Sequence, residues 1–315
     1  MARSTDRISA RCSAAALAAA AGLALAGASG PAGGALSAAP GGAAATDRLA
    51  YFDIRLDPEE QPVTAVAASL DRVQGDLAWR TRESRKAALA AQIPMLVVDD
   101  DGLVGTPRSV RSTVAFLTEP DLKASTTSVV ASFVDSHAEL FEFSGAEIRA
   151  AEVVRDYRTT HNGMRHIAFR QQIEGVDLFR TTLKANVTAD GRLLNVGGNF
   201  IPRPEGGFVT PKPVLGSSDA VRLAAASVGI ALTDQMLVDV PATGASAQTV
   251  WKPARQLRAD EPIVTEFVYF PMTRTDIRAA WTAVIPAPGL GHTYDVVVDA
   301  VSCEILYRHD RLVFD

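Results

Sequence analysis

The sequence is poor in cysteine, with Cys12 and Cys303 as its only thiols in 315 residues. Cys12 falls in a segment that we expect to be removed, so the mature chain would keep Cys303 alone. An exported protein with one thiol has no internal disulfide, and its fold must then depend on a hydrophobic core. Since 47% of the residues are hydrophobic, the chain has enough apolar side chains for one or two cores.

Motifs of catalysis are missing as well. The sequence contains no H-E-x-x-H zinc helix, no G-x-S-x-G elbow and no phosphate-binding P-loop. His161 and His166 are separated by Asn162-Gly163, which predicts a turn instead of a shared helix face for a metal. The run 99–102, Asp-Asp-Asp-Gly, lacks the other ligands of a calcium loop. We therefore expect no catalytic residue, no metal site and no cofactor.

Clusters of positive charge are also absent beyond the first residues. The formal net charge is −5, and no dense run of lysine and arginine is present. Phosphate backbones and anionic lipid heads attract basic patches, so an acidic chain of this kind is a poor partner for them. The composition argues against binding to nucleic acid.

The amino terminus has the pattern of an export signal. Arg3, Arg7 and Arg11 precede an alanine-rich apolar run at 14–26, and small-residue triplets follow it. A short membrane anchor is the alternative, but a span needs about 20 strongly apolar residues. We expect residues 1–28 to be a signal peptide cleaved near Ala28, and the protein to be secreted without a membrane anchor.

The remaining chain predicts an α+β fold of two similarly built units, each with one helix packed on an antiparallel sheet. Residues 29–46 are a Gly/Pro/Ala-rich leader that we expect to be disordered, and 47–104 form a helical and extended segment with a helix at 64–92. The first unit spans 105–202, residues 203–216 are a Pro/Gly linker, and the second unit spans 217–315.

The periodicity within each unit predicts the individual elements. In the first unit, apolar spacing predicts a helix over 125–140 and strands over 152–158, 164–173 and 176–188, with a fourth strand at Leu194, Val196 and Phe200. In the second unit, Ser217, Ser218 and Asp219 are candidate caps of a helix that ends at Gly229. Strand-like runs follow at 236–240, 262–270, 277–286, 292–300 and 303–309.

Two local features of the first unit carry further expectations. The inward parity of 176–188 changes near 178–179, which predicts a β-bulge. The pairs Glu174-Gly175 and Asp190-Gly191 indicate hairpin turns, and Asp-Gly favours type I′. Gln171 and Gln172 lie within a strand; because glutamine does not titrate, we interpret them as hydrogen-bonding groups, either within the sheet or toward a protein partner.

Residues 128–202 resemble the fungalysin/thermolysin propeptide module, abbreviated FTP, of secreted zinc metalloproteases. The resemblance rests on a helix that ends near "LF", a "VRDY" strand, a strand–turn–strand with the pattern F-x-Q-x-x-x-G, and a "DGxLL" hairpin. The matching positions here are Leu140, Phe141, Val154, Arg155, Asp156, Tyr157, Phe169, Gln171, Gly175, Leu178, Phe179, Asp190 and Gly191. Residues 105–109 and 297–308 are similar to the same prosegment, the latter to the closing hairpin of a PepSY-like second unit with a cystatin-like fold.

The resemblance implies a protein that acts by docking on a zinc metalloprotease as an inhibitor and folding assistant. We expect the segment 307–315 to occlude the protease cleft, with Gln172, Tyr307, Arg308, His309, Asp310 and Arg311 as partner-binding residues. Two alternatives remain open: a truncated precursor that lacks its catalytic domain, which follows the prosegment in the family, and a stand-alone extracytoplasmic binding module.

Cys303 departs from the family pattern, which has glycine at this point of the closing hairpin. As a lone exported thiol, Cys303 is a candidate reactive group, either as a ligand to a partner's zinc or in a mixed disulfide. The alternative is that it replaces a turn residue.

Overall fold

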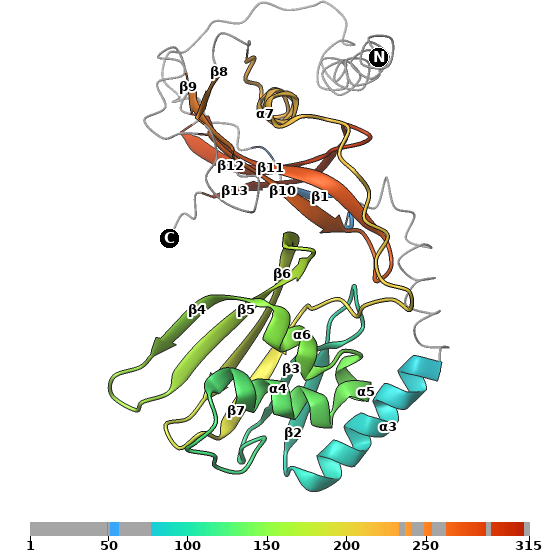
Figure 1. Ribbon diagram of the computed structural model, residues 1–315, viewed down its shortest axis with the longest axis vertical. Coiled ribbons are helices and arrows are strands. Elements are labelled where there is room, and N and C mark those ends of the chain that lie inside the picture. Colours follow the sequence, from blue (N-terminus) through green and yellow to red (C-terminus); the bar gives the residue numbers. More distant parts are fainter. Residues whose placement is uncertain are drawn as a thin grey trace, which may run out of the picture. The chain divides into compact units, whose positions relative to one another are not determined.

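The computed structural model describes residues 49, 51–56, 77–232, 237–240, 249–253, 263–287 and 291–311. The expected signal peptide and leader lie outside these residues. The described chain forms two units. The first unit contains residues 77–210 and 269–278, and the second contains the other described residues. Both combine helix with antiparallel sheet, which confirms the α+β class (Figure 1).

The described part of the first unit has four helices, α3 (Leu77–Gln92), α4 (Thr126–Ser136), α5 (Ala138–Phe141) and α6 (Gly145–Ala150). Helix α4 begins where the Ser125 side chain accepts a hydrogen bond from Ser128 N at 3.1 Å. Its buried face includes Val130 and Val134, as the apolar spacing predicts. The backbone of His137 leaves the helical conformation, so the helix expected over 125–140 is divided into α4 and α5.

The sheet of the first unit has the strand order β4-β5-β6-β7-β3-β2 with antiparallel neighbours throughout. The strands are β2 (Leu96–Asp100), β3 (Pro107–Ser112), β4 (Glu152–Arg158), β5 (Arg165–Ile173), β6 (Val176–Val187) and β7 (Leu193–Gly198). One face packs against α4 and α6 in a core that includes Phe169, Leu183 and Val196. Alternate residues of a strand point to opposite faces, so this face collects the apolar half of each alternating run.

The predicted bulge in β6 is confirmed. Arg170 pairs with Thr182 and Gln172 pairs with Asp177, so four residues of β6 stand opposite one residue of β5. Within this interval Arg180 has a positive φ of 57°. Leu178 and Leu183 are both buried although they differ in parity, because the extra residues turn the strand's faces over.

The two hairpin turns differ in type. Glu174 and Gly175 have φ values of 54° and 80°, the two positive angles of a type I′ turn. At the second hairpin Gly191 has a φ of 85° while Asp190 is not among the residues with positive φ, and Gly191 N donates to Thr188 O at 3.0 Å. This is a type I turn followed by a left-handed glycine, so the type I′ expected for Asp190-Gly191 is wrong.

The second unit consists of α7 (Ser217–Ala226) and an antiparallel sheet. Its strands are β1 (Phe52–Asp53), β8 (Leu237–Val240), β9 (Thr249–Pro253), β10 (Ile263–Pro271), β11 (Ile277–Ala287), β12 (His292–Asp299) and β13 (Ile305–Asp310). They follow the order β1-β13-β12-β11-β10-β9-β8. The end of β10 and the start of β11 belong to the first unit, where Tyr269 pairs with Leu178.

Helix α7 packs its small and branched side chains on this second sheet. Ala224 and Val221 share a core with Trp281 and Val296. The N-cap of α7 is Gly216 and makes no side-chain hydrogen bond, so the caps expected at 217–219 are wrong. At the other end Gly229 has a φ of 79°, in agreement with the expected stop.

Three strands were not expected from the sequence: β1, β2 and β9. Strand β2 includes Asp99 and Asp100, which suggest a turn by their residue type, and its partner β3 places them in a ladder. Strand β2 and helix α3 belong to the first unit, so the segment 47–104 is not a separate part of the fold where it is described. The part of the expected helix at 64–76 lies outside the described residues.

Candidate partner-binding site

Gln171 ties β5 to the segment that follows β7. Its Nε2 donates to the carbonyl oxygen of Ile201 at 2.8 Å, and its Oε1 accepts from Ile201 N at 2.8 Å. The bulge leaves Gln171 without a partner in the β5–β6 register, and its carboxamide offers Ile201 the same donor and acceptor as a peptide group. The first of the two readings of Gln171 is therefore confirmed, because the side chain is buried and its hydrogen bonds are internal.

Gln172 points to the other side of β5 and joins a polar group at the strand surface. Its Nε2 donates to Asp177 Oδ1 at 2.7 Å and to Glu152 Oε2 at 3.2 Å. Arg170 Nη1 lies 2.6 Å from the second oxygen of Asp177. This group links β4, β5 and β6, and a role of Gln172 toward a partner stays a prediction.

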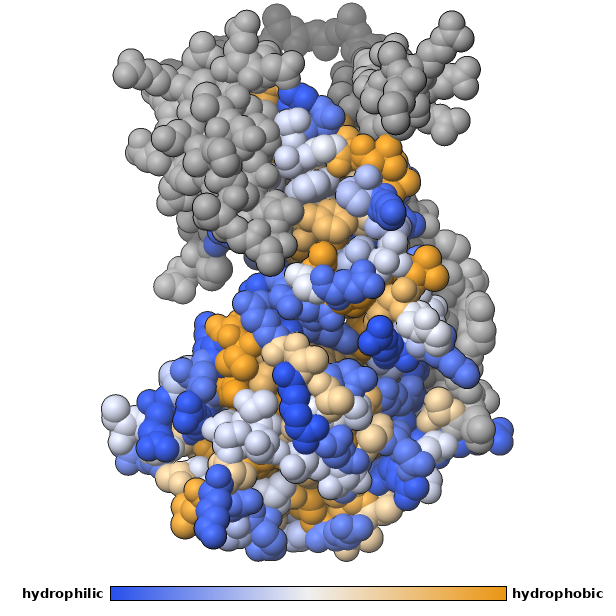
Figure 2. Space-filling view, viewed as in Figure 1, coloured by the Kyte–Doolittle hydropathy of each residue, from blue (hydrophilic) through white to orange (hydrophobic). Residues whose placement is uncertain are grey.

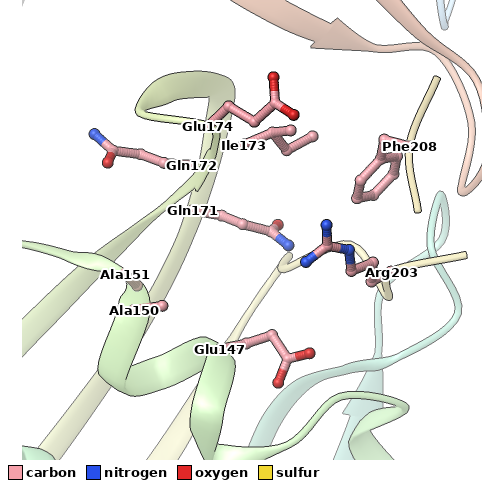
Figure 3. A pocket seen from close by; sticks show the side chains of 9 residues that line it. All are labelled: Glu147, Ala150, Ala151, Gln171, Gln172, Ile173, Glu174, Arg203 and Phe208. Carbon is pink, nitrogen blue, oxygen red and sulfur yellow. The ribbon is translucent and has the colours of Figure 1, made fainter. Parts of the chain in front are cut away.

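A pocket opens beside these two glutamines (Figure 3). It encloses about 530 Å³ of empty volume, part of which is open solvent. Its walls are the end of α6, the β5–β6 hairpin and the chain after Ile201, and the lining residues are Glu147, Ala150, Ala151, Gln171, Gln172, Ile173, Glu174, Arg203 and Phe208. The two hydrogen bonds between Gln171 and Ile201, which we call the Gln171 clamp, fix the start of the segment from which Arg203 and Phe208 reach the pocket.

The charged side chains of the pocket are mixed in sign. In Figure 3 the guanidinium of Arg203 points back toward the strand of Gln171, and Ile173 and Phe208 face each other beyond it. Arg203 and Glu174 are exposed and form no ion pair with any described residue. Glu147 is occupied, since its Oε2 accepts from Ser144 N at 3.0 Å and caps α6. The pocket thus combines apolar side chains with exposed charged groups of both signs.

The other motif residues divide into core and surface positions. Phe141 and Phe169 are fully buried in the core of the first unit. Phe179 stacks on Phe270 with centroids 5.4 Å apart. Tyr157 is half-exposed and stacks on His166 at 4.6 Å. These placements agree with structural roles, and sequence reasoning did not separate Tyr157 from the buried aromatics.

The expected partner-binding residues near the C-terminus lie in a strand. Strand β13 pairs with β12 on one edge and with β1 on the other. Tyr307 and Asp310 are buried, at 0% and 3% exposed, which disagrees with the expectation that they contact a partner. Residues 312–315, the rest of the expected occluding segment, lie outside the described residues.

The other expected partner-binding residues of this segment form contacts within the second unit. Arg308 Nη1 donates to Ser227 O at the end of α7, where a cation complements the helix dipole, and burial lowers the pKa of this guanidinium. Arg311 Nε donates to Asp295 Oδ1 at 2.8 Å. Asp310 Oδ2 lies 2.7 Å from His292 Nδ1, a buried pair that the sequence did not indicate. His309 stacks with Tyr307 at 6.3 Å.

Cys303 occupies the closing turn of the second unit with a φ of 70°. A positive φ favours glycine, so Cys303 holds a backbone conformation that residues with a side chain rarely adopt. The side chain of Cys303 is 6% exposed, and its role as a reactive thiol stays a prediction. The other cysteine of the sequence, Cys12, lies outside the described residues.

Ion pairs shift several pKa values on the surface of the first unit. Arg192 and then Thr188 lower the pKa of Asp190 to about 2, and Arg165 lowers the pKa of Asp156. The backbone N–H of Gly145, together with Arg149, lowers the pKa of Asp135. None of these carboxylates lines the pocket of Figure 3.

Glu142 forms partly buried contacts that the sequence did not indicate. It follows α5 with a φ of 58° and forms ion pairs with Arg82 of α3 and with Arg274 of the 269–278 segment. Arg82 is almost completely buried, and a buried guanidinium requires such a partner. No local sequence pattern predicts these two ion pairs, because Arg82 and Arg274 lie 60 and 132 residues away from Glu142.

Two further features are absent from the part of the chain that the structure describes. Among the described residues, no group of three or more His, Cys, Asp and Glu side chains could hold a metal ion. No helix in the described part of the chain is both long and apolar enough to cross a membrane.

A family model matches the region of the motif residues. Residues 151–200 match the family model described as Fungalysin/Thermolysin Propeptide Motif. Among solved structures, the C-terminal domain of YpeB from Bacillus megaterium is similar, with 10% identity, a TM-score of 0.30, and coverage of 69% of this chain and 76% of that chain. No curated protein matches the sequence. The chain thus carries a fungalysin/thermolysin propeptide motif, which spans strands β4 to β7 of the first unit.

Proposed function

We propose that this chain binds a secreted zinc metalloprotease of the fungalysin/thermolysin type, inhibits it, and assists its folding. The observation that carries the proposal is the match of residues 151–200 to the propeptide motif. A propeptide acts by fitting against its enzyme, so the activity requires a shaped surface and no reactive group of its own. The chain would act on a protease in trans, or in cis in a longer relative.

The build of the first unit supports this role. Phe169, Leu183 and Val196 are buried beneath α4 and α6, which holds the motif strands in one arrangement. A surface that is already ordered loses less conformational entropy on binding than a flexible one. The pocket beside Gln171 and the exposed strand β4 are the features that such a surface offers to a partner.

Inhibition and folding assistance follow from the same contacts. A protein that binds the folded protease, and not the unfolded chain, raises the population of the folded form by mass action. If the contacts already exist in the folding transition state, the folding rate rises as well. A stable complex should bury roughly 1,200–2,000 Å².

The direct test is inhibition in trans. The purified full-length chain is titrated against several fungalysin- and thermolysin-type enzymes with casein as substrate, and a progressive loss of hydrolysis toward stoichiometric inhibition is expected for the cognate enzyme. An arginine-to-glutamate variant at Arg203, in the pocket, should weaken inhibition, whereas the same change at Arg108 of β3, outside the pocket, should not. Undiminished hydrolysis by every enzyme at saturating chain would contradict the proposal.

Folding assistance needs its own measurement. Each enzyme is unfolded in guanidinium and diluted with and without the chain, and recovered activity is measured after the chain has been removed by proteolysis. We expect a higher yield with the chain than with an equal mass of albumin. The chain alone should neither hydrolyse casein nor retain zinc after dialysis; casein cleavage by the chain itself would remove the basis of the proposal.

A further inference from the structure

The sheet of the first unit has a second face, opposite the face that packs on α4 and α6. We call it the open face. Register pairs place its residues in rows across the strands: Tyr157, His166, Asn186, Asn195 and Arg111 in one row, and Arg155, Ala168, Lys184 and Gly197 in the next. Figure 2 shows the side from which α4 and α6 lie in front of this sheet, where hydrophobic residues form small groups between hydrophilic ones.

The open face carries an excess of positive charge. Arg111, Arg155, Arg170 and Lys184 lie on it, together with the carboxylates of Asp99, Glu152 and Asp177. Arg111 is paired with Asp99 at 2.6 Å, and Arg170 with Asp177 at 2.6 Å. Arg155 and Lys184 form no ion pair with any residue that the structure describes, and both are exposed. These two charges are therefore available to a partner.

The arrangement of the two cations is specific. Ala168 of β5 pairs with Arg155 of β4 on one side and with Lys184 of β6 on the other. Neighbouring strands are about 4.8 Å apart, so the backbones of Arg155 and Lys184 are about twice that distance from each other, with the Ala168 methyl group between them. A carboxylate that approaches Ala168 would have a cation on each side of it. We call Arg155, Tyr157, Ala168 and Lys184 the Arg155–Lys184 patch.

Tyr157 supplies an apolar element next to the cations. It lies two residues from Arg155 on the same face, is 50% exposed, and stacks on His166 at an interplanar angle of 18°. His166 is itself fixed, since its ring nitrogens lie 2.7 Å from Thr159 Oγ1 and 2.5 Å from Asn186 Oδ1. An aromatic ring that is held in place and flanked by arginine is the kind of side chain that dominates protein interfaces.

We propose that the Arg155–Lys184 patch docks on an acidic surface of the protease, with carboxylates of the partner beside Ala168 and Tyr157 as an aromatic contact. This inference rests on the proposed function and assigns the part of the chain that recognises the enzyme. The net charge of −5 argues for a folded protein partner, because a long polyanion would be repelled by the rest of the chain while a local acidic patch would not.

The test compares charge reversals on the two faces of one strand. Arg155→Glu and Lys184→Glu are combined in one variant of the full-length chain. The control is Arg158→Glu, which lies on the same strand but opposite Arg165, on the other face, and also lacks an ion pair with described residues. The inhibition constant is measured with the protease that the wild-type chain inhibits, at low and high salt, and thermal unfolding of each variant verifies its fold.

We expect the double reversal to raise the inhibition constant about a hundredfold, or about tenfold per charge, and to remove most of its salt dependence. Arg158→Glu should stay close to wild type. Tyr157→Ala should raise the constant independently of salt. If wild type inhibits and the double reversal inhibits equally well, the inference is wrong while the proposed function stands. If wild type inhibits no enzyme, both fall; heparin displacing the protease from wild type but not from the reversal would assign the patch to polyanions instead.

Discussion

Strands β4 and β13 both combine apolar and charged residues but differ in how far they are buried. Strand β4 reads EVVRDYR and β13 reads ILYRHD, each with a tyrosine next to charged residues. Every residue of β4 is exposed, and among the described residues it pairs with β5 alone. Strand β13 lies between β12 and β1, and its tyrosine is completely buried. The described residues of β4, in the propeptide motif, are therefore more accessible to a partner than those of β13.

The largest difference in stability should be found between alanine variants of the tyrosines in these two strands. Tyr307→Ala removes a ring that is 0% exposed and should lower the free energy of unfolding by about 4 kcal/mol, as for other large aromatic truncations. Tyr157→Ala, at a half-exposed position, should cost under about 1 kcal/mol. Urea unfolding followed by tryptophan fluorescence measures both. Equal losses for the two variants would contradict the comparison.

The hairpin tips of the motif provide a second contrast. A Cβ on Gly191 would lie 2.1 Å from the backbone oxygen of Asp121 at a φ of 85°, whereas a Cβ on Gly175 meets nothing within 4 Å at a φ of 80°. Gly191→Ala should therefore destabilise by about 3 kcal/mol or more, and Gly175→Ala by about 1 kcal/mol. Urea midpoints measure the difference. If both alanines have the same effect, close packing at Gly191 is not what requires glycine.

The two adjacent glutamines separate an internal contact from a surface contact. Gln171→Leu removes both hydrogen bonds to Ile201 and leaves the buried backbone N–H and C=O of Ile201 without a partner. This should lower the free energy of unfolding by about 2–3 kcal/mol. Gln172→Leu loses hydrogen bonds at a partly exposed position and should cost under about 1 kcal/mol. Hydrogen exchange at Ile201 N–H should accelerate only in the first variant. Unchanged protection there would disprove the clamp.

The smallest effect concerns pH. The pKa of Asp190 is lowered from 3.8 to about 2 by Arg192 and Thr188, so its contribution is complete above about pH 4 and is lost as the pH falls toward 2. Asp190→Asn should therefore be slightly less stable than wild type at pH 7 and equal to it near pH 2. Urea unfolding at the two pH values measures this. A difference that persists at pH 2 would assign the effect to turn geometry instead of charge.

The alternation of apolar residues was sufficient to predict the α+β class and most strands of both units. Residues 262–270, 277–286 and 292–300 correspond closely to β10, β11 and β12, because a strand that packs on a helix must have one apolar face. The parity change near 178–179 even indicated the bulge. Such signals are local, and burial on one face is sufficient to produce them.

The strands and the turn type that the sequence did not predict share a physical cause. Strands β1, β2 and β9 gain their structure from pairing with a neighbour, and Asp99 and Asp100 carry no strand signal of their own. The turn at Asp190-Gly191 depends on the close approach of Asp121, which lies far away in sequence. Contacts between distant residues cannot be read from composition or spacing.

The amino-acid sequence by itself determined the motif, the layout of helices and strands, and the excess of acidic residues. Only the tertiary structure decided which side chains remain accessible. Gln171, Arg155 and Tyr157 are all matching positions of the motif, yet Gln171 is buried and the other two are exposed. The reason is that the exposure of a side chain depends on the elements that pack against its strand, and these elements come from distant parts of the chain.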